Sequence, residues 1–94
     1  MNSTEQKEEL LDQLYDQTVE GQAEPVKMLT DELLKLGMAP NEILDEGLIP
    51  ALEEVGRMFE EGTYFVPEML VAAKAMQGAM GQLAPMIAEQ GIQP

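Results

Sequence analysis

The sequence predicts a small all-α protein, a four-helix bundle, and three observations lead to this fold class. Apolar residues recur every three or four positions in four stretches, which is the spacing of one face of a helix. Glycine or proline separates each stretch from the next. No stretch alternates apolar and polar residues as a half-buried strand does. With 94 residues, the chain can form one domain with a modest core, but not a deep enclosed pocket.

The first two helices are expected at residues 4–20 and 23–36. Gly21 ends the first, Pro25 is acceptable only in the first turn of the second, and Gly37 stands where a C-terminal glycine belongs. The short connection makes the two helices antiparallel neighbours. Their apolar stripes are interpreted as core: Leu10, Leu11, Leu14, Tyr15, Thr18 and Val19 in the first, and Val26, Leu29, Leu33, Leu34 and Leu36 in the second.

The third helix is expected at residues 40–61, with Pro40 in its first turn. Pro50 cannot donate a hydrogen bond to residue 46 and should bend the helix. Gly47 and Gly56 each lower helix stability by about 1 kcal/mol relative to alanine, so we expect close packing or a bend at them. The apolar stripe comprises Ile43, Leu44, Leu48, Ile49, Leu52, Val55, Met58 and Phe59.

The fourth helix is expected at residues 67–90, with a bend at Pro85. Its main seam is interpreted as core and comprises Met69, Ala73, Met76, Met80, Leu83 and Ile87. A second face of small residues should let another helix approach closely; it comprises Ala72, Ala75, Gly78, Ala79 and Gly81. Met69 is the exception among the methionines, because it lies one turn beyond an apolar loop, where a partner contact is expected.

That loop places Tyr64, Phe65 and Val66 between the helix breakers Gly62 and Pro67. Loops normally carry polar residues, because a buried loop leaves backbone groups unpaired. Two explanations remain open. In a hydrophobic staple, Val66 would be the N-cap of the fourth helix and Phe65 would pack on Leu70. Alternatively, the loop and the first turn after it form a lid on an apolar ligand or partner.

Composition restricts the chemistry. The chain has 5 Lys and Arg against 18 Asp and Glu, a net charge of −13, which disfavours binding to nucleic acids and to anionic membranes. It has no histidine and no cysteine, so zinc hydrolysis, His-based acid–base catalysis and thiolate chemistry are excluded, and we do not expect an enzyme. Glu60, Glu61 and Glu68 are interpreted as a solvated acidic rim. No signal peptide or membrane span is indicated, and a cytoplasmic location is expected by default.

Five motifs resemble the helical cap of cobalamin-dependent methyl-carrying proteins, which include the corrinoid proteins of methanol, methylamine and aryl-ether demethylation systems and cobalamin-dependent methionine synthase. They are Gly-Leu-Ile-Pro at 47–50, Val-Gly at 55–56, Phe-Glu-Glu-Gly at 59–62, Phe-Val-Pro-Glu at 65–68 and Ala-Lys-Ala-Met at 73–76. The resemblance covers residues 10–89. It implies a four-helix bundle over the upper face of the corrin ring, with Phe59, Phe65, Val66 and Met69 as the covering side chains.

The resemblance further implies that the cap gates methyl transfer between methyltransferases, which would choose the methyl donor and acceptor. In that family a Rossmann-like domain with an Asp-x-His-x-x-Gly motif binds cobalamin. We expect residues 1–90 to be the cap domain and 91–94 the start of a linker to such a domain, which this chain lacks. Negligible cobalamin affinity is therefore expected of the chain alone, together with a homo-oligomer formed through the lid face. The alternative is a free-standing acidic helical interaction or oligomerisation module.

Overall fold

The structure, a computed structural model, describes residues 3–89, which form helices without any strand. The helices are α1 (Ser3–Val19), α2 (Ala23–Lys35), α3 (Pro40–Ile43), the π-helical segment η1 (Leu44–Leu48), α4 (Ile49–Glu60) and α5 (Val66–Glu89). Since α3, η1 and α4 run on continuously, the predicted four-helix bundle is confirmed, with the helix ends one residue or less from those expected. The expected linker at 91–94 lies outside the described residues.

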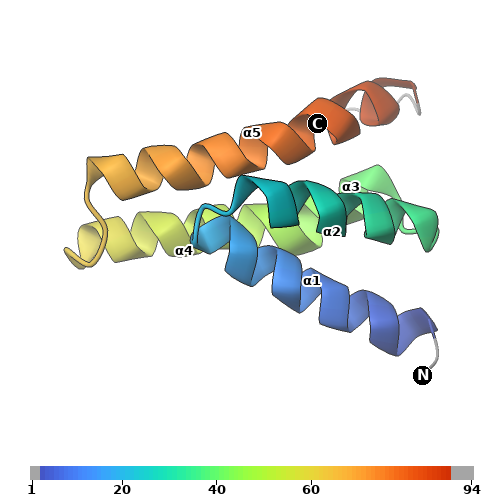
Figure 1. Cartoon of the computed structure of the whole chain (residues 1–94), viewed down its shortest axis with the longest axis horizontal. Coiled ribbons are helices and arrows are strands. Elements are labelled where there is room, and N and C mark those ends of the chain that lie inside the picture. The colour runs from blue at the N-terminus through green and yellow to red at the C-terminus, as the bar shows by residue number, and fades with distance from the viewer. Residues whose placement is uncertain (1–2, 90–94) are drawn as a thin grey trace.

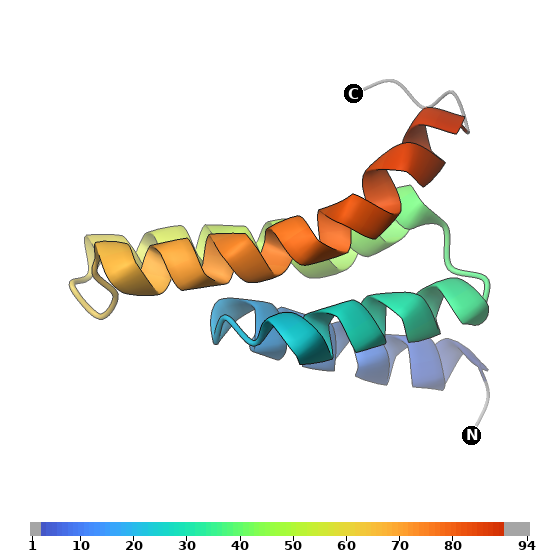
Figure 2. The same cartoon turned by 45° about the horizontal axis from the view of Figure 1, so that its top comes forward.

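The helices form two layers of antiparallel hairpins (Figure 1). One hairpin is α1 with α2, and the other is α4 with α5, which lies above it in Figure 2. Side chains from both layers form one core: Leu10 and Leu14 on α1, Val26, Leu29 and Leu33 on α2, Met38 in the loop that follows, Ile43 on α3, Leu48 in η1, and Ala75, Ala79 and Leu83 on α5.

The bend expected at Pro50 takes the form of a local widening of the preceding turn. Because Pro50 has no N–H, the carbonyl of residue 46 lacks its usual donor. The preceding turn is π-helical, and the N–H of Ile49 donates to the carbonyl of Leu44, five residues back. Within this turn Gly47 touches α1, since a Cβ atom there would lie 2.8 Å from Leu14 Cδ2. Close packing at Gly47 is thus confirmed.

The core side of α5 combines both predicted faces, and the prediction that its main seam is core is confirmed for the C-terminal part of the seam. Ala72, Ala75 and Ala79 of the small-residue face are buried, and so is Leu83 of the seam. Met76, Met80 and Ile87 of the seam are partly buried and pack against the core, and Met69 is half-buried. Small side chains bring α2 and α5 close together, and the aliphatic part of Lys27 lies 3.5 Å from the Cβ position of Gly78. The last turns of α5, which contain Pro85, leave the axis of its first part (Figure 2).

The α4–α5 hairpin projects beyond the α1–α2 hairpin. At 1.5 Å per residue, the 24 residues of α5 span about 36 Å, whereas the 13 residues of α2 span about 20 Å. The α1–α2 turn meets α5 at Val71: a Cβ atom on Gly21, whose φ is +74°, would lie 2.4 Å from Val71 Cγ1. The end of α4 and the start of α5 therefore extend past the α1–α2 turn, as both views show (Figures 1 and 2).

Candidate functional site

The projecting end of the hairpin gathers four of the nine large apolar side chains that residues 3–89 leave exposed. Phe59 at the end of α4 is 44% exposed, Phe65 in the loop 63% and Val66 at the start of α5 56%, while Met69 is half-buried. Leu70, one turn into α5, is 64% exposed. We call these five side chains the tip residues. They include all four positions that the sequence predicted as covering side chains.

The backbone of the loop is fixed at its α4 end by a glycine cap. Gly62, at φ +83°, donates its N–H to the carbonyl of Phe59 (3.1 Å), and Thr63 donates to the carbonyl of Met58 (2.9 Å). This pair of hydrogen bonds is the Schellman arrangement, in which glycine tolerates the left-handed conformation that the turn requires.

At the α5 end, Phe65 is the N-cap residue. Its carbonyl accepts the first helical hydrogen bond, from Met69 (3.2 Å), and its N–H donates to Glu68 Oε1 (3.3 Å), which is one half of a capping box. The prediction that Val66 is the N-cap is therefore wrong by one residue. A staple between Phe65 and Leu70 does not account for the loop, because both side chains remain more than 60% exposed.

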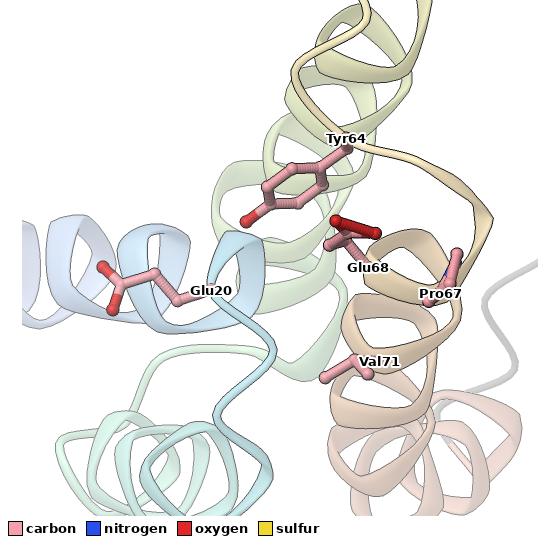
Figure 3. A pocket seen from close by; sticks show the side chains of 5 residues that line it. All are labelled: Glu20, Tyr64, Pro67, Glu68 and Val71. Atoms are coloured by element: carbon pink, nitrogen blue, oxygen red, sulfur yellow. The ribbon is translucent and has the colours of Figure 1, made fainter.

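Tyr64 ties the loop back to α1. Its hydroxyl donates to the carbonyl of Val19 over 2.8 Å, and its half-buried ring reaches across to the α1–α2 turn (Figure 3). The ring borders a hollow of about 200 Å³ that Glu20, Pro67, Glu68 and Val71 complete. The hydrogen bond that holds Tyr64 to α1 was not predicted from the sequence. The signal was available, since Tyr64 is the only one of the three apolar loop residues that carries a hydroxyl group.

The charged side chains near the C-terminal end of α4 form ion pairs with one another. Arg57 donates to Glu54 (Nε to Oε1, 2.7 Å) and also bonds Glu61, and its hydrogen bond lowers the pKa of Glu54. Glu61 and Glu68 are thus engaged in an ion pair and a helix cap, not in an acid–base pair. Among residues 3–89, the acidic side chains nowhere gather in a group that could hold a metal ion.

A second, larger hollow lies between α1 and α2, away from the loop. It measures about 380 Å³ and is lined by Gln13, Gln17, Pro25, Met28, Leu29 and Glu32. Half of its lining residues are polar, and of its two large apolar side chains Leu29 is buried and only Met28 is exposed. The tip residues therefore remain the better candidate for binding a large apolar surface.

Comparison with known proteins decides the family. Residues 10–84 match the family described as "B12 binding domain". This chain belongs to that family. The matched range includes every tip residue, most of both hairpins and the Gly-Leu-Ile-Pro segment at the start of α4. The resemblance to the helical cap of corrinoid proteins is thereby confirmed.

Relatives of this B12 binding domain include corrinoid proteins of Methanosarcina species. The chain is 33% identical to trimethylamine corrinoid protein 1 of Methanosarcina acetivorans over 84% of its length, and 35% identical to monomethylamine corrinoid protein 2 of the same organism over 90%. The solved monomethylamine corrinoid protein of Methanosarcina barkeri superposes with a TM-score of 0.80 at 32% identity over 83% of the chain. In each case the chain spans only 37% of the relative's length.

The residues present fit a corrin as a partner. A corrin offers a broad apolar face, and the tip residues offer uncovered apolar and aromatic side chains on a backbone that hydrogen bonds hold in place. The chain contains no histidine, so it offers no imidazole to cobalt.

None of the helices in the described part of the chain is long and apolar enough to cross a membrane.

Proposed function

We propose that this B12 binding domain is the cap of a corrinoid methyl carrier, in which Phe59, Phe65, Val66 and Met69 cover the upper face of cobalamin. The observation that carries the proposal is the exposure of Phe65 and Val66 on a loop whose backbone N–H groups, from Gly62 to Phe65, all donate hydrogen bonds within the chain. Such a loop does not need these side chains for folding. Because exposed apolar side chains that gather in one place mark a binding surface, we infer that a partner covers them.

Cobalamin, when bound, supplies the cobalt–carbon chemistry of methyl transfer, and the residues of this chain supply its shelter. Phe65 and Val66 exclude water from the covered face, and Phe59 extends that cover from α4. The cap must move aside when a methyltransferase approaches, which makes it a gate. Tyr64, through its bond to Val19, keeps the loop attached to the bundle, so that the cap moves as one body.

The tip residues alone are too few to hold cobalamin. At about 25 cal/mol per Å² of apolar surface, covering a handful of partly exposed side chains contributes on the order of 5 kcal/mol. Association costs about 4–15 kcal/mol in translational and rotational freedom. We therefore infer that a second, Rossmann-like domain would provide most of the affinity for cobalamin.

A chimaera tests the proposal. This chain is joined to the remainder of the Methanosarcina barkeri monomethylamine corrinoid protein in place of the matching 37%, and compared with that remainder alone. Loaded with methylcobalamin, the chimaera should lose the methyl group to anaerobic photolysis at least about tenfold more slowly, which corresponds to about 1.4 kcal/mol of closed-state stabilisation. The chain alone should leave the visible spectrum of cobalamin unchanged at micromolar concentrations. Equal photolysis rates with and without the chain would refute the cap function.

We further propose that the chain, when alone, associates through its tip residues. Exposed apolar side chains that gather on one projecting end promote association, and a symmetric dimer is the commonest outcome. Sedimentation of the chain should show a concentration-dependent dimer that Phe65→Ala weakens. A strict monomer at high concentration would contradict this. A dimer that Phe65→Ala leaves intact would instead favour the alternative function, an acidic helical interaction module that uses another face.

A further inference from the structure

The exposed side of α4 continues the apolar surface of the tip residues toward the middle of the bundle. Ile49, Leu52 and Phe59 are each between 37% and 45% exposed. Steps of three or four residues keep side chains on one face of a helix, so these three form a single stripe. The next face around, with Ala51 and Val55, is buried in the bundle.

Gly56 lies in the middle of this stripe, four residues after Leu52 and three before Phe59. A Cβ atom at Gly56 would meet no heavy atom within 4 Å. Its φ is not positive, so the backbone does not require glycine there. Gly47, in the same continuous helix, differs, because α1 packs directly against it.

Neither folding nor packing inside this chain therefore explains Gly56. Glycine within a helix is unfavourable relative to alanine, because it restricts the unfolded chain less and leaves backbone exposed. The remaining use of glycine in such a position is to let a ligand approach the backbone closely. The gap it leaves lies on the apolar stripe that runs into the tip residues.

We propose that Gly56 is a contact position for the corrin ring, where the absence of a side chain lets the macrocycle lie close to the α4 backbone between Leu52 and Phe59. This inference rests on the proposed cap function and extends its binding surface along α4. The missing side chain at Gly56 leaves a shallow depression between the side chains of Leu52 and Phe59, and a flat ring can lie against such a depression. The van der Waals attraction between the ring and α4 depends on this close approach. A gap of about 0.5–1 Å would lose a quarter to a half of that attraction.

The substitution Gly56→Ala separates this function from a structural one, because the two predict effects of opposite sign. In the chain alone, Gly56→Ala should raise Tm by roughly 4 °C, since the new methyl group meets nothing and helix propensity improves. In the methylcobalamin-loaded chimaera, the same change should speed anaerobic photolysis about threefold, because the methyl group holds the ring away from α4 and the cap closes less well.

Gly81 provides a matched control. It also lies in a helix, on α5, and a Cβ atom there also meets nothing within 4 Å. Gly81→Ala should give the same rise in Tm and leave photolysis unchanged. If Gly56→Ala raises Tm without changing photolysis, while Phe65→Ala with Met69→Ala does change it, the cap function stands and the inference about Gly56 is wrong. If neither variant changes photolysis, both are wrong. A loss of dimer without a change in photolysis would assign Gly56 to contact with a second copy, and would equally overturn the inference.

Discussion

Replacing Phe65 and Met69 together by alanine should speed the anaerobic photolysis of methylcobalamin in the chimaera about tenfold. The two changes remove apolar contacts that exist only when the cap is closed, and a loss of about 1.4 kcal/mol raises the population of the open state tenfold. The free energy of unfolding of the chain should change by less than about 1 kcal/mol, because Phe65 is largely exposed and Met69 is only half-buried.

Met28→Ala is the matched control for this pair. Met28 on α2 is 63% exposed, as Phe65 is, but it borders the hollow between α1 and α2. Its replacement should leave photolysis unchanged. A double variant that unfolds the chain would show that Phe65 and Met69 serve the bundle itself. Equal acceleration by Met28→Ala would show that the effect does not come from the projecting end of the α4–α5 hairpin.

Leu14→Ala should destabilise the chain by about 2–5 kcal/mol, which is a large part of the total expected for a domain of this size. Leu14 is fully buried, and its Cδ2 atom fits against Gly47, where the π-helical turn meets α1. The helices on both sides are held by further contacts, so the cavity would not collapse completely. Urea unfolding, followed by far-UV circular dichroism, measures the loss.

The same chemical change at Leu70 is the control for Leu14. Leu70 is 64% exposed at the start of α5, and Leu70→Ala should change the free energy of unfolding by less than about 0.5 kcal/mol. The contrast between the two leucines separates the core from the apolar surface that the core does not need. Similar losses at both positions would mean that the tip residues are part of the folding core, and would contradict the proposed cap.

The helix ends could be predicted from the sequence because Gly21, Gly37, Pro40 and Gly62 mark them chemically. Glycine and proline act locally, so no tertiary information was needed. The π-helical turn before Pro50 was expected only as a bend. Proline removes a hydrogen bond, but the packing of Gly47 against α1 decides how the helix makes up for it.

The exposure of Ile49 and Leu52 could not be predicted in the same way. A periodic stripe shows which face of a helix is apolar, but not whether another helix of the same chain covers it. Here the bundle buries the side of α4 that carries Ala51 and Val55, and Ile49 and Leu52 lie beside it, 37% and 45% exposed. The candidate site was predicted from the unusual loop and the resemblance together. The tie from Tyr64 to α1 joins residues 45 positions apart, which local patterns do not reveal.

A crystal structure of the methylcobalamin-loaded chimaera tests the central claim most directly. The account predicts that Phe59, Phe65, Val66 and Met69 lie within about 4.5 Å of the upper face of the corrin ring, which is the distance of apolar contact. A corrin ring whose upper face is covered by other residues, with these four side chains turned to solvent, would contradict it.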